Sequence, residues 1–181
     1  MVLLALAASG PLAEAQPSWP DADLRAGRLS FDGKATLGAF TGSTDSVRGR
    51  MVGGPSLRGV RGWVEAPVRA LKTGNNRRDR DLYKAMEADI YPTIRFQLES
   101  VEPQWERSDS ASAVLTGQFF IHGVNRPERI PALVSRTPEG IRVTASLPMD
   151  LRHYQIEGLT RLLIFKMKPE IVVHVDVMFG Y

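Results

Sequence analysis

Three histidines are the side chains in this sequence best suited to acid–base chemistry or metal binding. They lie far apart, at His122, His153 and His174, and lack the H-x-H or H-E-x-x-H spacing that brings two imidazoles to one metal ion. His122 precedes a glycine at a predicted strand end, where a turn or an inter-strand hydrogen bond is the usual role. His153 is expected at the surface and His174 on the polar face of the last strand. The sequence therefore predicts no metal site.

The sequence also lacks the residues that nucleophilic catalysis requires. The chain has no cysteine, which excludes disulfides, thiolate metal sites and cysteine nucleophiles. It has no G-x-S-x-G sequence, and Gly53-Gly54-Pro55 is followed by no predicted helix, so P-loop and Rossmann phosphate sites are absent too. The acidic residues fall mostly on the polar faces of predicted strands. We expect no catalytic residue and no cofactor, and a protein that is not an enzyme.

The densest positive charge lies in the stretch LKTGNNRRDRDLYKAM, which starts at Leu71 and contains Arg77, Arg78 and Arg80 together with Lys72 and Lys84. One interpretation is a seat for a lipid phosphate, built from arginine side chains and the amides of a helix N-terminus near Asn75. The alternative is that Arg78 pairs with Asp79 while the other cations are solvated. No aromatic side chain alternates with the arginines, and the net charge of the chain is only +3, so nucleic acid is not an expected partner.

These residues have to be positioned by strands, because alternation of apolar and polar residues dominates the sequence. In residues 140–150, GIRVTASLPMD, every second side chain from Ile141 to Met149 is apolar. The same pattern occurs in residues 93–100 and 170–180, and more weakly near residues 28–39, 44–52, 59–71, 112–121 and 128–135. The pattern predicts about eight strands.

One segment is predicted to be a helix, near residues 76–89. Leu82 and Met86 are four residues apart, Asn76 or Asp79 can cap the start, and a proline at position 92 prevents continuation. Residues 21–26 and 156–167 are ambiguous between helix and strand.

Eight sequential antiparallel strands with one apolar face each predict an all-β fold with the short helix in a crossover, either a closed antiparallel barrel or a sandwich. An open sheet would expose that face and two unpaired edges, whereas a barrel or a sandwich removes both problems. Many inward residues are small, so an apolar cavity is one interpretation and a filled core is the other. The expected lining residues of such a pore are Phe31, Val64, Phe96, Leu98, Phe119, Ile121, Leu147, Met149 and Val175.

The N-terminal residues have the pattern of an export signal. An apolar run is followed by Ala13-Glu14-Ala15, a small-x-small cleavage pattern, and the run is too short to span a bilayer. We expect a signal peptide at residues 1–15, an N-terminal arm at 16–27 and a barrel domain at 28–181. A periplasmic or secreted location follows from this expectation.

Several ordered sequence motifs resemble the YceI-like family. They are LKTGNNRRDRDLYKAM, YPTIRF from Tyr91, LTGQFFIHGVNRP from Leu115 and YQI from Tyr154, and GAFTGSTDSVRGRM from Gly38 is similar to the family's opening hairpin. The resemblance covers roughly residues 28–179. It implies a lipocalin-like barrel, usually exported, whose elongated apolar pore binds polyisoprenoid chains. The family has no agreed catalytic residues, and Phe119 stands where leucine is commoner.

The resulting hypothesis is an exported binding protein that holds an isoprenoid-type lipid, such as a quinone tail or a polyprenyl phosphate, as a carrier or reservoir. An enzyme acting on such a lipid and a ligand-free accessory or stress protein of the cell envelope are the alternatives. A homodimer and an envelope protein partner both stay open, and no membrane-spanning segment is expected.

Overall fold

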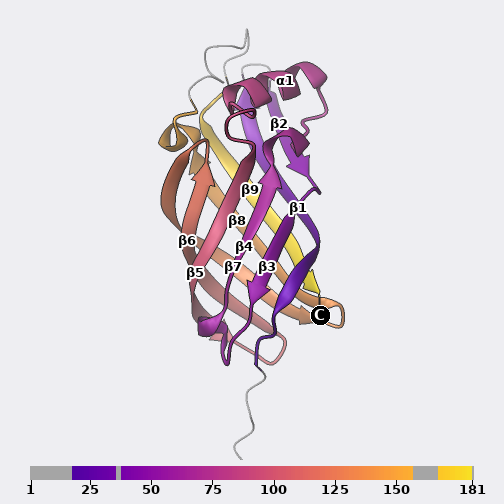
Figure 1. The fold of residues 1–181 in the computed structure, drawn as a ribbon, viewed down its shortest axis with the longest axis vertical. Helices are drawn as coiled ribbons and strands as arrows, with labels where there is room; N and C mark the ends of the chain where they lie inside the picture. The colour runs from indigo at the N-terminus through magenta and orange to yellow at the C-terminus, as the bar shows by residue number, and fades with distance from the viewer. Residues whose placement is uncertain (1–17, 36–37, 157–166, 181) are drawn as a thin grey trace, which may run out of the picture.

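The computed structural model describes residues 18–35, 38–156 and 167–180, in which the chain forms a closed β-barrel with one α-helix across one end (Figure 1). The predicted signal peptide, residues 1–15, and most of the segment 156–167 lie outside these residues. The strands are β1 (Ala22–Ala35), β2 (Gly38–Thr44), β3 (Arg48–Val52), β4 (Arg61–Pro67), β5 (Thr93–Glu106), β6 (Ser110–Ile121), β7 (Val124–Thr137), β8 (Gly140–Asp150) and β9 (Glu170–Gly180). The helix is α1 (Asn76–Ala85), and the 3-10 turns are η1 (Leu57–Gly59), η2 (Val68–Ala70) and η3 (Leu151–Tyr154).

Pairing of the first strand with the last closes the sheet. All neighbouring strands are antiparallel, and the ring runs β1-β3-β4-β5-β6-β7-β8-β9 before β9 returns to β1. β2 is an additional strand that pairs with β1 from Leu29 onward, beyond the short pairing of β1 with β3 at Ala22 and Asp23. The predicted all-β barrel of about eight strands, with a short helix in a crossover, is confirmed.

The first strand begins before residue 28, the predicted start of the barrel domain, because residues 22–27 form the first part of β1. The pairing of β1 with β9 shifts register between Leu24 and Ala26, so that Arg25 is an extra residue in the strand. The next inward position is Gly27, whose missing Cβ would lie 3.0 Å from Val177 Cγ1. The register shift and the inward glycine together interrupt the alternation of apolar and polar residues. The sequence therefore does not predict the start of this strand.

The helix starts and ends where local chemistry requires. Asn75 is its N-cap: the Oδ1 atom accepts hydrogen bonds from the backbone amides of Arg77 (3.0 Å) and Arg78 (3.1 Å). Gly74 precedes it with a φ of +73°, a left-handed conformation that glycine adopts readily. The helix ends at Ala85, four residues before the predicted end, and turns follow it. Within the described part of the chain, no helix is long and apolar enough to cross a bilayer.

Asp79 ties this helix to the strand crossover that precedes it. Its side chain is 5% exposed, and Oδ1 accepts hydrogen bonds from the Thr73 amide (2.8 Å) and the Thr73 hydroxyl (2.6 Å). Arg78 turns away from Asp79: its guanidinium donates to the Thr73 carbonyl (2.8 Å) and lies 4.2 Å from the centre of the Phe40 ring. The local Arg78–Asp79 pair that we considered is therefore not formed.

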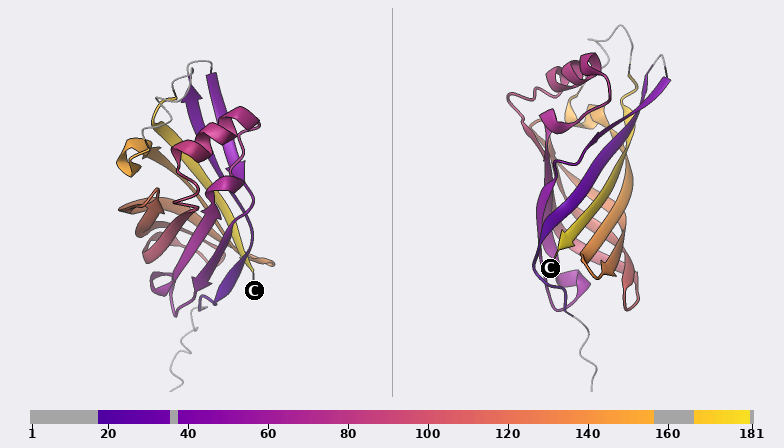
Figure 2. Two further views of the ribbon diagram at one scale, coloured as in Figure 1. Left: turned by 45° about the horizontal axis from the view of Figure 1, so that its top comes forward. Right: turned by 90° about the vertical axis from the view of Figure 1, so that its right-hand side faces the viewer.

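Two clusters of buried residues pack the two ends of the barrel. One cluster lies beneath α1 and includes Leu82, Met86 and Tyr154. The other lies at the opposite end and includes Trp19 and Ile141. Figure 2 shows α1 lying over one end of the strands, with the C-terminal end of β9 at the other. The inward apolar residues between the clusters are only partly buried, which indicates free space in the middle of the barrel.

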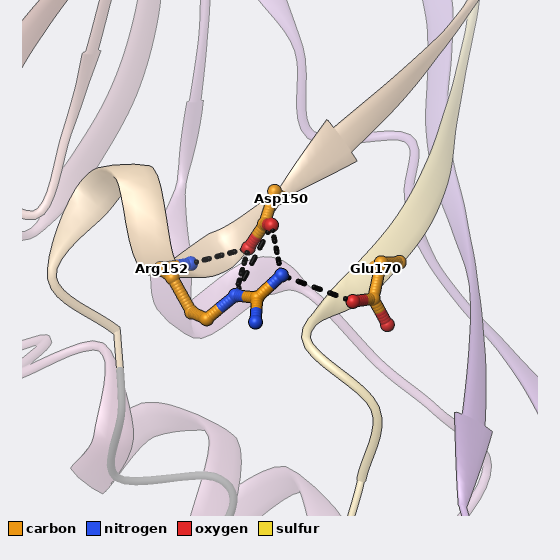
Figure 3. Close-up of polar contacts among 3 residues, drawn as sticks. All are labelled: Asp150, Arg152 and Glu170. Atoms are coloured by element: carbon orange, nitrogen blue, oxygen red, sulfur yellow. Dashed lines mark hydrogen bonds and ion pairs between the residues drawn. The ribbon is translucent and has the colours of Figure 1, made fainter.

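An ion-pair network joins β8 and β9 where both strands reach the helical end (Figure 3). The guanidinium of Arg152 donates to Asp150 (2.6 Å to Oδ2) and to Glu170 (3.1 Å), and the Arg152 amide also donates to Asp150 (2.9 Å). These hydrogen bonds, from the Arg152 side chain above all, lower the pKa of Asp150 to about 2. The network therefore joins the end of β8, where the chain leaves the sheet, to the start of β9, where the chain returns to it.

Replacing Asp79 with alanine should lower the free energy of unfolding by about 1–3 kcal/mol, because the buried amide of Thr73 loses its acceptor. Urea denaturation monitored by circular dichroism measures the change. Asp81→Ala on the same helix is the matched control, since it removes a carboxylate that makes no hydrogen bond or ion pair with the described residues. Equal loss in the two variants would contradict the assigned role.

Asp150 should make the barrel more stable above pH 4 than below it. Its pKa is lowered from 3.8 in the absence of partners to about 2 in the fold, so its contribution is present above pH 4 and is lost as pH falls toward 2. The free energy of unfolding of Asp150→Asn, measured by urea denaturation from pH 5 to pH 2, should therefore fall less steeply than that of the unmodified protein. Glu139→Gln, which removes a carboxylate from an exposed hairpin position, is the matched control.

Candidate functional site

The barrel contains an apolar cavity that extends between its two packed ends. Its volume is about 200 Å³, and a single water molecule needs roughly 10–15 Å³ of such space, so the cavity is more than tenfold larger. All eight strands of the closed ring contribute lining residues, as do Leu82 of α1 and Met86, the residue that follows the helix. Apart from Ser30, Arg50 and Arg61, the lining side chains are apolar, tryptophan included.

Most of the residues predicted to line a pore do line this cavity. They are Phe31, Val64, Phe96, Leu98, Phe119, Ile121, Met149 and Val175. Leu147 is the exception: it is buried in the cluster beneath α1 and does not contact the cavity. The pairing of β7 with β8 ends at Ala132 and Ala145, so Leu147 belongs to a part of β8 that β7 no longer accompanies. The alternation of apolar and polar residues predicts that Leu147 points inward. It does not predict that β7 and β8 separate before Leu147.

Two phenylalanines on adjacent strands form an aromatic pair in the wall of the cavity. Phe96 of β5 is paired in register with Phe119 of β6, and their ring centres are 4.9 Å apart with a tilt of 50°. Gly117 makes room for this arrangement, because a Cβ there would lie 2.7 Å from the Phe96 ring and 2.2 Å from the Gln97 carbonyl oxygen. The pair supplies a broad apolar surface without a polar atom.

The two ends of the cavity are closed differently. At one end, Trp19 exchanges two backbone hydrogen bonds with Gly54 (2.8 and 2.9 Å), and the Arg136 guanidinium lies 4.0 Å from the centre of the indole. At the other end, α1 lies across the opening (Figure 2), and Leu82 and Met86, the residue after the helix, line the cavity. Backbone pairing therefore holds the Trp19 end, whereas the α1 end combines side-chain packing with the backbone pairing of Ser43 with Lys72 (2.8 and 2.9 Å).

The structure does not gather the predicted phosphate-binding residues into one site. Asn75 is used as the helix cap, and Arg78 is half-buried against Phe40. Arg77 and Arg80 are exposed and point away from the cavity side of the helix. The Nε atom of Arg78 has no hydrogen-bond partner among the described residues. These residues thus form a helix cap, an aromatic contact and a solvated face.

His122 has the turn role expected from the sequence. It has a φ of +52° and forms the hairpin turn between β6 and β7 with Gly123. Nδ1 is 3.0 Å from the carbonyl oxygen of Tyr154, so it carries the hydrogen and donates it. Nε2 lies 3.3 Å from Glu87 Oε2 but outside hydrogen-bonding alignment. The residue connects the turn after α1 to η3.

Four polar side chains form a hydrogen-bonded row on the outer wall that the sequence does not predict. They belong to Ser146, His174, Asp32 and Thr41. Ser146 Oγ is 2.8 Å from His174 Nδ1, and His174 Nε2 is 3.0 Å from Asp32, which also accepts from Thr41 (2.6 Å). Hydrogen bonds from Thr41 and His174 lower the pKa of Asp32. Only the pairing of β9 with β1 brings Asp32 to this position, and no local sequence signal reports it.

This row has the connectivity of a hydrolytic triad but a different setting. It borders an open groove of about 480 Å³ on the outer wall, and the side chains of His174 and Asp32 are 40% and 54% exposed. Water weakens electrostatic interactions at such a site, and catalysis also needs donors preorganised for an oxyanion. Because the row follows neighbouring strands, it is best described as a cross-strand hydrogen-bond network. No group of three or more metal-ligating side chains occurs within the described residues.

Both the sequence and the fold are similar to those of known proteins. A family model described as YceI-like domain matches residues 21–179. Among solved structures, a polyisoprenoid binding domain from Saccharophagus degradans implicated in plant cell wall breakdown is 15% identical, with a TM-score of 0.74 over 87% of this chain and 97% of that one. BcnA of Burkholderia cenocepacia is 12% identical, with a TM-score of 0.69 over 83% and 94%. A Campylobacter jejuni YCEI protein is 15% identical, with a TM-score of 0.62 over 77% and 84%. No curated protein matches the sequence.

At these identities the structural matches establish the fold alone, whereas the family match is a statement about sequence. It spans the barrel from the residue before β1 to the penultimate residue of β9. The chain belongs to the YceI-like family.

Proposed function

We propose that this protein holds a long apolar lipid of the isoprenoid type in its barrel cavity and acts as a carrier or reservoir. The observation that carries the proposal is the apolar cavity of about 200 Å³ between two packed ends. Binding without catalytic turnover is part of the proposal. A quinone tail and a polyprenyl phosphate tail both have the required chemistry.

Burial of apolar surface can supply the binding energy by itself. Each square ångström removed from water contributes about 25 cal/mol, so several hundred Å² of alkenyl chain would contribute several kcal/mol before ordering costs. The aromatic rings of Phe96 and Phe119 and the flexible side chains of Met86 and Met149 suit an unsaturated chain with regular methyl branches. Such a site needs no charged residue to recognise its ligand.

Family membership supports the same class of ligand. The Saccharophagus degradans protein of the same fold is described as a polyisoprenoid binding domain. The N-terminal sequence supports an exported, periplasmic or secreted protein, a location in which an apolar lipid needs a protein to cross water. A ligand-free accessory protein of the envelope would have no use for the free space in the centre of the barrel, because voids lower stability.

Organic extraction of the full-length protein, purified from its native cell envelope, should release close to one isoprenoid lipid per chain. Mass spectrometry identifies the lipid by its repeating five-carbon units and distinguishes a quinone from a polyprenyl phosphate. The accessory-protein alternative would be favoured instead if no lipid were recovered and the purified barrel excluded hydrophobic dyes.

Filling the cavity should weaken binding. Ala145 and Val143 line the cavity, whereas Thr144 between them borders only the outer groove, so the alternation of β8 makes Ala145→Phe place a ring inside and Thr144→Phe place one outside. The dissociation constant for a fluorescent polyisoprenyl alcohol should rise at least about tenfold in Ala145→Phe, or about 1.4 kcal/mol, and little in Thr144→Phe. Unchanged affinity in a folded Ala145→Phe variant would place the ligand outside the barrel.

A further inference from the structure

The two faces of α1 have opposite character. Its inner face buries Asp79, Leu82 and Ala85, and Leu82 contacts the cavity. Arg77, Arg80 and Lys84 are all exposed, and their spacing of three and four residues places them together on the opposite face. Figure 2 shows that this helix lies over the end of the barrel, so the basic face is turned outward. We call Arg77, Arg80 and Lys84 the basic face of α1.

The cations of the basic face have no acidic partner among the residues that the structure describes. This differs from many arginines of the barrel wall, which form ion pairs, such as Arg28 with Asp45 (2.9 Å) and Arg48 with Glu65 (2.6 Å). On α1, Asp79 is buried and bonded to Thr73, so it cannot neutralise the outer face. Asp81 is the other acid of the helix, and its single charge leaves the outer surface of α1 positive.

An exposed apolar side chain follows the basic face. Ile90, in the turn after α1, is 67% exposed, the largest exposed fraction among the large hydrophobic side chains of the described residues. Its amide donates to the Glu87 carbonyl (2.8 Å), so the turn holds it close to the helix end. Cations combined with an adjacent exposed apolar residue are typical of protein surfaces that bind the headgroup region of an anionic bilayer.

We propose that the basic face of α1 docks this protein on the surface of an anionic phospholipid bilayer. Charge complementarity identifies an anionic bilayer as the partner. The three cations make no ion pair with the described residues, so they can pair with lipid phosphates, which form a dense negative surface. Docking would set the α1 end of the cavity against the membrane. The inference rests on the proposed function for its purpose, the exchange of an apolar lipid, but its test needs no lipid in the cavity.

Vesicle co-sedimentation of the full chain tests the proposal. The vesicles contain no isoprenoid lipid and consist of phosphatidylcholine alone or with about a third phosphatidylglycerol, a composition that gives an anionic surface. The protein should bind the anionic vesicles and release from them at high salt. Each cation near the surface contributes about fivefold to partitioning, so the variant Arg77→Gln/Arg80→Gln/Lys84→Gln should bind about a hundredfold more weakly.

The matched control is Arg25→Gln/Arg58→Gln/Arg107→Gln. It changes the net charge equally but alters exposed cations remote from α1 in the chain, in β1, in η1 and in the turn after β5. It should bind like the unmodified protein, and circular dichroism checks that both variants are folded. The proposal is overturned if the unmodified protein does not sediment with anionic vesicles, or if both variants lose binding equally. Either result leaves the lipid-extraction experiment, and with it the proposed function, unaffected.

Discussion

Closure of the sheet between β1 and β9 imposes the geometry on which the cavity, the helix and the outer wall all depend. Once the two strands pair from Asp23 to Asp32, the ring has no free edge along this seam, and all inward side chains must share one interior. An eight-stranded ring encloses a space just wide enough for side-chain packing or for one small ligand. Whether that space is filled is then decided by the size of the inward residues.

The interior is packed at both ends and hollow between them. Large side chains such as Trp19 and Tyr154 occupy the end clusters, whereas smaller ones such as Val64, Ala145 and Val175 face the middle. Protein interiors usually pack as densely as organic crystals, and voids cost roughly 24 cal/mol per Å³ in cavity-creating variants. A hollow band therefore lowers the stability of the empty barrel. A ligand that fills the band restores the missing contacts, which links binding to stability.

The sequence predicts the strands well where alternation is unbroken. The predictions for β8 and β9 agree with the structure, the predicted strand at residues 93–100 covers the first part of β5, and eight of the nine predicted lining residues contact the cavity. Prediction fails where the chain departs from period two or where contacts are remote. Arg25 is an extra residue that interrupts the alternation at the start of β1. The contact of Asp32 with His174 forms only because β1 and β9, which are far apart in sequence, pair in the fold. The outward direction of Arg77 and Arg80 becomes visible only when the buried face of α1 is known.

The parting of β7 from β8 makes the two ends of the barrel mechanically different. Pro127 and Pro131 lie on the half of β7 that β8 leaves unpaired, and Pro148 lies on the matching half of β8. Prolines cannot donate to a ladder, so they keep these edges from pairing with each other or with another chain. Side chains of η3 complete the wall here, with the Tyr154 hydroxyl donating to Glu128 (3.2 Å).

Opening the barrel at this end would therefore break side-chain contacts and a few hydrogen bonds but no strand ladder. Opening the opposite end would separate Trp19 from Gly54 and disrupt paired backbone. Local stability generally follows such differences, since elements with few backbone links open at the lowest free energy. The gap between β7 and β8 at the α1 end is accordingly the part of the barrel wall that can open with the least disruption of strand pairing.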